Sequence, residues 1–545
     1  MTRPIVTLVF FLMLMSKTYA EDFFVHPQGS DKNTGLTIKL PWKTLDKASQ
    51  HQYKPGDRLL LAKGQRFSGQ LLLNSQHGQL NKPILISSYP TDKSDETYSY
   101  IDAGNKSSAL SIINSSYVEV TDIALSGEGA TEHHKLTKNI KAMRLGVLVK
   151  ATQPGDYRGI VLKGLMIKNV FYHKVGFQRG DKEVKTANGK QSYGWGIRVI
   201  NHLKNATISN LQISNNTIHN VAHTGIKFTS KYQNIQDVQV THNKVTETGG
   251  PGIQLSGVNK GYFAYNLVNY SGSNNDSRKW GRGSGLWTWS SNNILIEHNE
   301  FSNANGPGDS AGVHIDFNCS NVVVQYNLST NNAGGFCEIL GNNYNNAYRY
   351  NISVNDGHRV KGVDGAFQEG KTFWLSGYRG KGKKRQGPFN SYFYNNTIYL
   401  DESIESKIAI DKKAKGILIA NNIFHIIGKS KGVLGDQYVA DTANSATLKN
   451  VVFQNNLFLK HDNWPQTMTI KDSNPVYGDA QFLKNGGVNV RDYIPRNKTK
   501  VQGKGMIIKH LPNDNVGLNV GLKVTTDILN NPVGKFPGLG AIEIQ

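Results

Sequence analysis

Nine asparagines recur along the chain from residue 205 onward, each at the end of a short run in which apolar and polar residues alternate. They are Asn216, Asn243, Asn266, Asn299, Asn327, Asn351, Asn396, Asn422 and Asn456. Most successive intervals are 23 to 34 residues long, and one is 45. A repeat of this length, made of short strands and Gly or Asn corners without helical periodicity, predicts a parallel β-helix. The longest interval then marks a loop insertion.

Between these asparagines lies a second recurring piece, which begins with Gly and alternates with the period of two that is typical of a strand. Its copies are TGIKFTS (224–230), PGIQLSG (251–257), SGLWTWS (284–290), AGVHIDF (311–317) and GGFCEIL (334–340). Asn suits the corners because it tolerates the left-handed backbone conformation, and stacked Asn side chains can hydrogen-bond along a ladder. This regular alternation argues against a disordered polar tract.

The first twenty residues predict a secretory signal peptide, because a basic start precedes an apolar run from Ile5 to Met15 and a small-residue site at Ala20. No later segment is apolar for the roughly eighteen residues that a membrane span needs. We therefore expect an exported protein, periplasmic or extracellular, without a membrane span.

Basic residues exceed acidic ones by 22 over the whole chain. Such an excess attracts polyanions, and an exported protein meets acidic polysaccharides more often than nucleic acid. We expect an acidic polysaccharide or oligosaccharide as partner, no nucleic acid, and a monomer; alternatively, the charge only maintains solubility. Cys319 and Cys337 are the two cysteines, so no disulfide framework is expected.

Both ends of the chain resemble secreted right-handed parallel β-helix proteins of the pectate-lyase-like superfamily. The resemblance is carried by FFVHPQGSDKNTGLTIKLPWKTLDKA (23–48), KPGDRLLLAKGQRFSGQLLL (54–73), KPILISSYP (82–90) and TDILNNPVGKFPGLGAIEIQ (526–545). It implies an all-β, right-handed parallel β-helix with a carbohydrate polymer across one face, although the superfamily hosts lyases, hydrolases, epimerases and binding proteins. The expected division is a signal peptide (1–20), an N-terminal cap segment (21–110), coils that carry the active groove (111–470) and a closing segment (471–545).

Two carboxylates, Asp316 and Glu338, lie in neighbouring copies of the Gly-led strand. Aligning Gly312 with Gly334 points both outward in one column, about 4.8 Å apart at the backbone. A retaining glycosidase places its carboxyl groups roughly 5 to 5.5 Å apart, and such proximity raises one pKa. We predict Asp316 as nucleophile and Glu338 as acid/base, as in some β-helix glycosidases. Pairing Gly335 with Gly312 instead would turn Glu338 inward, at a high cost in burial.

Asp309 and His314 are further catalytic candidates in the same coil. Asp309 could form a more widely spaced, inverting pair with Asp316, or it could cap the turn in GPGDSAG. His314 could orient Asp316 or assist proton transfer, or be a structural surface residue. The alternative for Asp316 and Glu338 is that they are solvated carboxylates on the surface.

Substrate-binding candidates flank these acids along the outward columns. Tryptophans are platforms for sugar faces, and cations could recognise sulfate or carboxylate groups; the basic loop 378–387, YRGKGKKRQG, is either such a site or a loop without a partner. Glu369 could continue the acidic column by one coil. The candidate residues are Trp287, Trp289, Arg282, Lys227, Arg198 and Glu369.

These residues predict an exported glycoside hydrolase that cleaves an anionic, sulfated or uronate-containing, polysaccharide or oligosaccharide without a cofactor. In the alternative, a polysaccharide lyase, the acids Asp309, Asp316, Glu338 and Glu369 would hold Ca²⁺ while Lys227, Arg198 or Arg282 abstracts a proton. A third possibility is a non-catalytic carbohydrate-binding protein.

Overall fold

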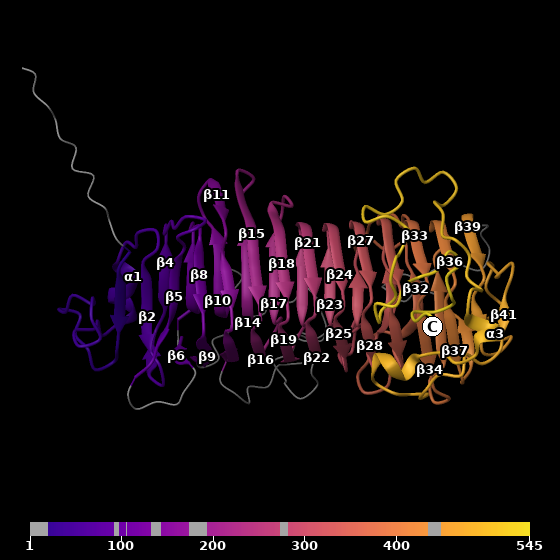
Figure 1. Cartoon of the computed structure of the whole chain (residues 1–545), viewed down its shortest axis with the longest axis horizontal. Coiled ribbons are helices and arrows are strands. Elements are labelled where there is room, and N and C mark those ends of the chain that lie inside the picture. The colour runs from indigo at the N-terminus through magenta and orange to yellow at the C-terminus, as the bar shows by residue number, and fades with distance from the viewer. Residues whose placement is uncertain are drawn as a thin grey trace, which may run out of the picture.

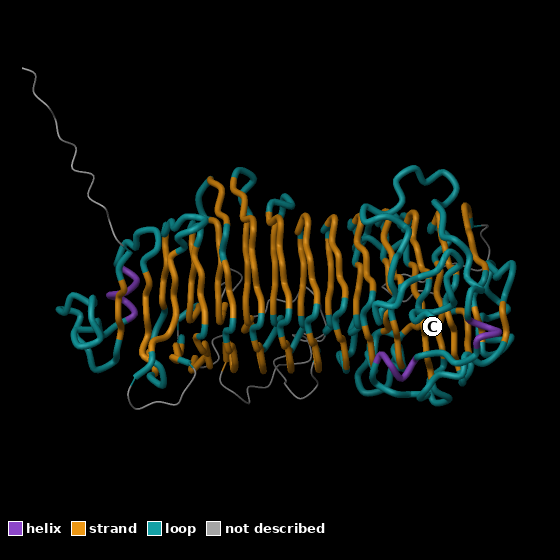
Figure 2. The backbone as a smooth tube through the Cα atoms, in the orientation of Figure 1, coloured by secondary structure: helices purple, strands orange, loops and turns teal. Residues whose placement is uncertain are grey.

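The chain winds into a long solenoid whose coils build three parallel sheets (Figures 1 and 2). The computed structural model describes residues 20–91, 98–104, 106–131, 143–173, 193–272, 282–433 and 448–545. The predicted parallel β-helix is confirmed. Residues 1–19, almost all of the predicted signal peptide, lie outside the described residues. Among the described residues, no helix is long and apolar enough to cross a membrane.

One strand of each coil belongs to sheet C, which carries the Gly-led repeat. Its strands pair in parallel with those of the preceding and following coils. In chain order they are β4 (Leu71–Asn74), β7 (Ser108–Ile113), β10 (Met143–Ala151), β14 (Tyr193–Asn201), β17 (Ile226–Ser230), β20 (Ile253–Ser256), β23 (Leu286–Trp289), β26 (Val313–Ile315), β29 (Gly335–Ile339), β32 (Lys371–Leu375), β35 (Ser406–Ile410) and β38 (Ser430–Gly432).

Sheet A holds the strands that precede each Asn corner. They are β1 (Asp22–Val25), β2 (Arg58–Ala62), β5 (Ile84–Tyr89), β8 (Val118–Thr121), β11 (Gly155–Arg158), β12 (Val161–Lys163), β15 (Ala206–Ser214), β18 (Ile235–Thr241), β21 (Val258–Ala264), β24 (Asn292–Glu297), β27 (Ser320–Gln325), β30 (Tyr344–Arg349), β33 (Phe389–Tyr394), β36 (Lys415–Ala420) and β39 (Lys449–Gln454).

Sheet B follows each Asn corner. Its strands are β3 (Arg66–Ser68), β6 (Ser99–Asp102), β9 (Ile123–Thr131), β13 (Met166–His173), β16 (Thr217–Val221), β19 (Lys244–Thr248), β22 (Leu267–Ser271), β25 (Glu300–Ser302), β28 (Leu328–Thr330), β31 (Ile352–Val354), β34 (Thr397–Leu400), β37 (Ile423–Ile426), β40 (Leu457–Phe458) and β41 (Val476–Tyr477). The short helices of the described chain are α1 (Leu45–Gln50), the 3₁₀ helix η2 (Val490–Tyr493) and α3 (Lys498–Val501).

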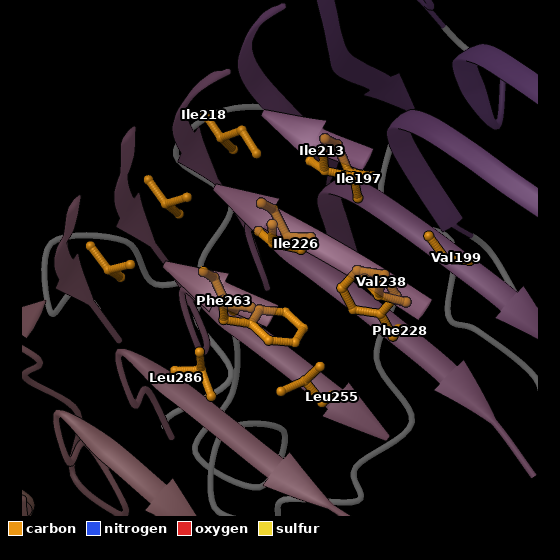
Figure 3. Packing of buried hydrophobic residues seen from close by; sticks show 14 of the residues in the cluster. Ile197, Val199, Ile213, Ile218, Ile226, Phe228, Val238, Leu255, Phe263 and Leu286 are labelled. Atoms are coloured by element: carbon orange, nitrogen blue, oxygen red, sulfur yellow. The ribbon is translucent and has the colours of Figure 1, made fainter. Parts of the chain in front are cut away.

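Alternation along each strand places one set of side chains inside the solenoid. In β17, Ile226 and Phe228 are fully buried, and Figure 3 shows them packing with Leu255 and Phe263 inside the coils. Lys227 and Thr229 therefore point to the outer face of sheet C.

The predicted Asn ladder is present over its whole length. Each Nδ2 donates to the Oδ1 of the next ladder residue at 2.9 to 3.0 Å, from Asn216 to Asn456. The expectation that these asparagines adopt the left-handed conformation is wrong. That conformation belongs to the residue before each of them, for example His242, Tyr265 and His298. The ladder positions select Asn for its amide, which donates and accepts at once.

The closing segment folds back over the outer faces of sheets A and B. Leu511 and Leu518 cluster with Tyr392 of β33, and Leu539 and Ile542 join the cluster that contains Ile352 of β31. In Figure 1 this segment is the yellow chain that crosses the strands near the C-terminal end. The candidate site lies instead on sheet C.

Candidate active site

Outward side chains of sheet C form a column that leads to the predicted acids. The strand register places Lys227 beside Arg198, then Gln254, Trp287 and His314 on successive strands. A parallel column contains Thr229, Ser256 and Trp289 and continues toward Asp316. Arg198, Lys227, Thr229, Trp287 and Trp289 are partly exposed, whereas the acids are buried.

The predicted register between β26 and β29 is wrong by two residues. Ile315 pairs with Ile339, and Ala311 with Gly335, which is an offset of 24 residues instead of 22. Because the error is an even number, Glu338 keeps its outward face. It lies level with His314, however, and is a diagonal neighbour of Asp316, roughly 8 Å away at the backbone. The competing alignment, which turns Glu338 inward, is also wrong.

Asp309 is held as a buried ion pair. Its Oδ1 lies 2.6 Å from Arg282 Nη1, and both side chains are at most 8% exposed. Asp309 and Ser310 have φ angles of 44° and 61°, a conformation that costs non-glycine residues energy. The Asp309 carboxylate accepts a hydrogen bond from Arg282, and this described contact does not cap the turn as the alternative expected.

The backbone around Asp309 is fixed by residues that the sequence analysis missed. Gln368 Oε1 accepts a hydrogen bond from the Asp309 amide at 2.5 Å. Arg359 Nη1 donates to the Asp309 carbonyl at 3.0 Å, and Arg359 Nε donates to the carbonyl of Gln368 at 2.6 Å. These contacts hold the left-handed turn in place.

Asp316 is oriented by two donors. The Trp287 indole donates to Oδ2 at 2.9 Å, and the amide of Phe317 donates to Oδ1 at 2.8 Å. Burial, together with the nearby Asp309 charge, nevertheless raises the pKa of Asp316 to about 8. Near neutral pH the carboxyl group of Asp316 therefore carries a proton.

Glu338 faces a neutral histidine. Its Oε1 lies 3.6 Å from His314 Nε2, and both side chains are almost fully buried. Burial lowers the pKa of His314 to about 4. Burial, followed by the Asp309 charge, raises the pKa of Glu338 well above its ordinary value. His314 is therefore not a surface residue, and it also stacks on Trp287 with ring centroids 5.7 Å apart.

Three of the predicted substrate-binding residues contact other side chains of the protein. Trp289 meets Phe317 edge to face at 6.0 Å, so its ring is only partly available as a platform. Arg198 lies over the Trp195 ring at 4.4 Å. Arg282, predicted to bind an acidic group of the substrate, forms an ion pair with Asp309 of the protein itself.

Glu369 does not continue the acidic column. Glu338 pairs in register with Trp374 of β32, whereas Glu369 lies in the turn before that strand and forms an ion pair with Lys407 at 2.7 Å. The long insertion ahead of β32 shifts the count along the chain, which is why the extrapolated column failed.

The basic loop 378–387 is tied to the site edge. Tyr378 contacts Phe317 edge to face at 6.0 Å, and Arg385 Nε donates to the buried Asp411 at 2.6 Å. The side chains of Lys381, Lys383 and Lys384 remain exposed. An anchored loop thus presents three cations beside the coil that carries Asp316.

The two cysteines are unbonded, as predicted, and both are buried. The observed register places Cys337 level with Val313. Among the described residues, no group of three or more His, Cys, Asp or Glu side chains is arranged to bind a metal ion. The four acids of the lyase alternative therefore do not converge, since Glu369 pairs with Lys407.

Comparison with known proteins finds similarity over part or most of the chain. The family described as right handed beta helix region matches residues 237–370. A lacto-N-biosidase of Bifidobacterium longum subsp. longum is 23% identical over 627 aligned residues, which cover 94% of this chain and 36% of the relative. The chain thus spans about a third of that relative's length.

A solved structure, the GH136 lacto-N-biosidase from Eubacterium ramulus, has a TM-score of 0.52 at 17% identity and covers 79% of this chain and 68% of its own. At this identity the likeness shows the fold. Together with the three parallel sheets, these matches show that the chain is a right-handed parallel β-helix protein.

Proposed function

We propose that the chain is a glycoside hydrolase that cleaves a sugar chain lying along the outer face of sheet C. The observation that carries the proposal is a pair of carboxyl groups on one coil that lie in different environments. Asp309 is paired with Arg282 at 2.6 Å, while burial and the Asp309 charge raise the pKa of Asp316 to about 8. Two carboxyl groups held in such different environments are typical of the acid and base pairs of glycosidases.

The two groups divide the chemistry between them. Asp316 donates its proton to the glycosidic oxygen as the bond to the anomeric carbon breaks. The Asp309 carboxylate meets the positive charge that develops on the anomeric carbon. This replaces the predicted nucleophile role of Asp316, because a protonated carboxyl group is a poor nucleophile. Retention of anomeric configuration in the product would make Asp309 the nucleophile, and inversion would make it the base that activates water.

Glu338 and His314 support this pair from the neighbouring strand. Glu338 faces the ring of His314, with Oε1 3.6 Å from Nε2, instead of Asp309 or Asp316. Trp287 links them to the acid, because its ring stacks on His314 while its N–H donates to Asp316. We assign Glu338, His314 and Arg359 as positioning residues.

The lacto-N-biosidase relatives support a glycosidase, and the charge of the chain supports an anionic substrate. The net charge is +22, and the basic loop exposes Lys381, Lys383 and Lys384 next to the site. A sulfated or uronate-containing oligosaccharide fits this surface. Export to the periplasm or the outside, inferred from the first twenty residues, would bring the protein to such polymers.

The test incubates the purified protein with acidic and sulfated polysaccharides and with nitrophenyl lacto-N-bioside, with and without chelator. New reducing ends without ultraviolet absorbance from unsaturated uronates, insensitive to chelator, are expected. Absorbance that rises with the reducing ends would make the protein a lyase. Binding without any turnover would make it a carbohydrate-binding protein.

Two substitutions separate the roles of the acids. Asp309→Asn should abolish turnover of every substrate. Asp316→Asn should lower turnover of oligosaccharides about 10²- to 10⁴-fold but spare nitrophenyl glycosides, whose leaving group needs no proton. Glu300→Gln, on sheet B, is the matched control and should leave activity unchanged. Equal losses on both substrate types in Asp316→Asn would contradict the acid role.

A further inference from the structure

We propose that Lys227, Thr229 and Gln254 form a subsite for the acidic group of a sugar residue, three strands away from the strand that precedes Asp316. The inference rests on the proposed function in one respect, namely that the sugar chain runs along sheet C. It specifies where the negative charge of the substrate binds.

The three side chains share one patch of the outer face. Lys227 and Thr229 are two residues apart on β17, and Gln254 is the register partner of Lys227 on β20. Lys227 and Thr229 are partly exposed, and Gln254 is 5% exposed. Adjacent strands are about 4.8 Å apart, so one sugar residue can reach all three.

Polar groups of this patch lack partners within the described part of the chain. Thr229 Oγ1 and Gln254 Oε1 are buried and make no hydrogen bond there. Lys227 likewise forms no ion pair or hydrogen bond with any described residue. Buried polar groups are nearly always hydrogen-bonded, so unpartnered groups on neighbouring strands indicate a position that a polar ligand occupies.

The local charge favours an anion at this position. Arg198 is the register partner of Lys227 on β14, which stacks two cations about 4.8 Å apart. Burial and the Arg198 charge lower the pKa of Lys227 to about 7. A carboxylate or sulfate beside Lys227 would offset this repulsion and restore the charged form of the amine.

The donors and acceptors match an acidic sugar. A carboxylate or sulfate oxygen accepts from the Lys227 ammonium and from the Thr229 hydroxyl, while a ring hydroxyl donates to Gln254 Oε1. Trp287, next in the column and partly exposed, lies between this patch and the acids. Three strand steps separate Lys227 from His314, roughly 14 Å, so the acidic residue binds away from the bond that is cleaved.

The experiment compares Lys227→Met with Lys231→Met, which removes the same charge from an exposed lysine in the turn after β17. Binding of D-galacturonate, D-glucuronate and galactose 6-sulfate is measured by calorimetry against D-galactose and D-glucose. The wild type and Lys231→Met should bind the acidic sugars, and Lys227→Met should bind them about ten- to a hundredfold more weakly. Preference for the uronates or for the sulfate identifies which group the site takes.

Thr229→Val provides a second, smaller perturbation that should weaken acidic sugars several-fold without disturbing the fold, as circular dichroism will check. Wild-type protein that binds no acidic sugar better than its neutral counterpart would overturn the subsite, as would equal losses in Lys227→Met and Lys231→Met. The hydrolysis assay reports separately on the proposed function. Turnover of neutral glycans without acidic preference refutes only the subsite, and acidic binding without turnover refutes only the hydrolase.

Discussion

Replacing Asp316 by Asn tests whether this carboxyl group is neutral in the folded protein, without any substrate. Burial and the Asp309 charge raise its pKa to about 8 from the ordinary 3.8. The folded protein therefore holds the proton more tightly than the unfolded chain does. Below about pH 4 the carboxyl group is protonated in both states, and the free energy of unfolding does not depend on it. As the pH rises toward 8, the group ionises in the unfolded state alone, and the free energy of unfolding falls progressively. At about 1.4 kcal/mol per pH unit, the full loss is about 6 kcal/mol.

The assay is urea unfolding of the wild type and Asp316→Asn at several pH values between 4 and 8. The variant also loses a hydrogen-bond acceptor for Trp287 or Phe317, but that cost does not change with pH. Relative to the wild type, the free energy of unfolding of Asp316→Asn should therefore rise by about 1.4 kcal/mol for each pH unit.

Asp237→Asn is the matched control, since its exposed carboxylate is 3.9 Å from Lys260, and exposed ion pairs of this kind contribute little to stability. A level or falling difference for Asp316→Asn would mean that Asp316 is ionised in the folded protein. The acid role would then be refuted, and the nucleophile role would return.

Further substitutions test the ion pair, the ladder and the glycine that precedes a strand of sheet C. Arg282→Met and Asp309→Asn should each destabilise the protein and together cost less than their sum, with a coupling energy of about 3 kcal/mol; additive losses would contradict a buried pair. Asn299→Ala should cost about 2 to 4 kcal/mol by thermal melting, because Nδ2 donates to Asn327, Phe263 and Glu297. The control Asn292→Ala removes two part-buried bonds, to Gln233 and from Ser320, and should cost less. Gly252→Ala should cost about 1 to 3 kcal/mol because a Cβ there would lie 2.2 Å from Val268 Cγ1, while Gly127→Ala, with its nearest neighbour at 3.5 Å, should be tolerated.

The fold could be predicted because a single residue type, Asn, recurs once in each coil and marks the repeat. Each ladder Asn must donate to one coil and accept from the other, so no other side chain fills the position equally well. The left-handed corner was assigned to the wrong residue because Asn is common at both positions. At the true corner, Tyr265 and His298 stack with ring centroids 5.1 Å apart, and this contact favours aromatic residues there.

The register of the acids was predictable from the ladder but not from glycine. Asn327 and Asn351 are 24 residues apart, and Ser320 of the same coil pairs with Tyr344 at the same offset. The ladder interval therefore contained the true offset of β26 and β29. Glycine misled the alignment because Gly334 lies in the bend before β29, and Phe336 takes the level of Gly312.

Other parts of the site had no signal of this kind. Arg359 and Gln368 lie in an insertion without periodicity, and they reach Asp309 only because the fold returns that loop to the neighbouring coil. A hydrogen bond across 50 or 59 residues leaves no local pattern. The same holds for Glu369, whose partner Lys407 is on β35.

A register error of two residues leaves each side chain of β29 on the same face of the sheet but changes its neighbours on β26. Here the change of neighbours alters which groups can form the acid pair. With the expected offset, two carboxyl groups would stack on adjacent coils and Asp309 would be incidental. With the observed offset, Glu338 meets His314, a neutral ring that cannot pair with it as an ion. Asp316 is then left with Trp287 as its side-chain partner and with the charge of Asp309 as its electrostatic neighbour. In the proposed mechanism the acid pair thus moves from two coils to one, and Arg282, which forms an ion pair with Asp309 at 2.6 Å, becomes as important as either acid.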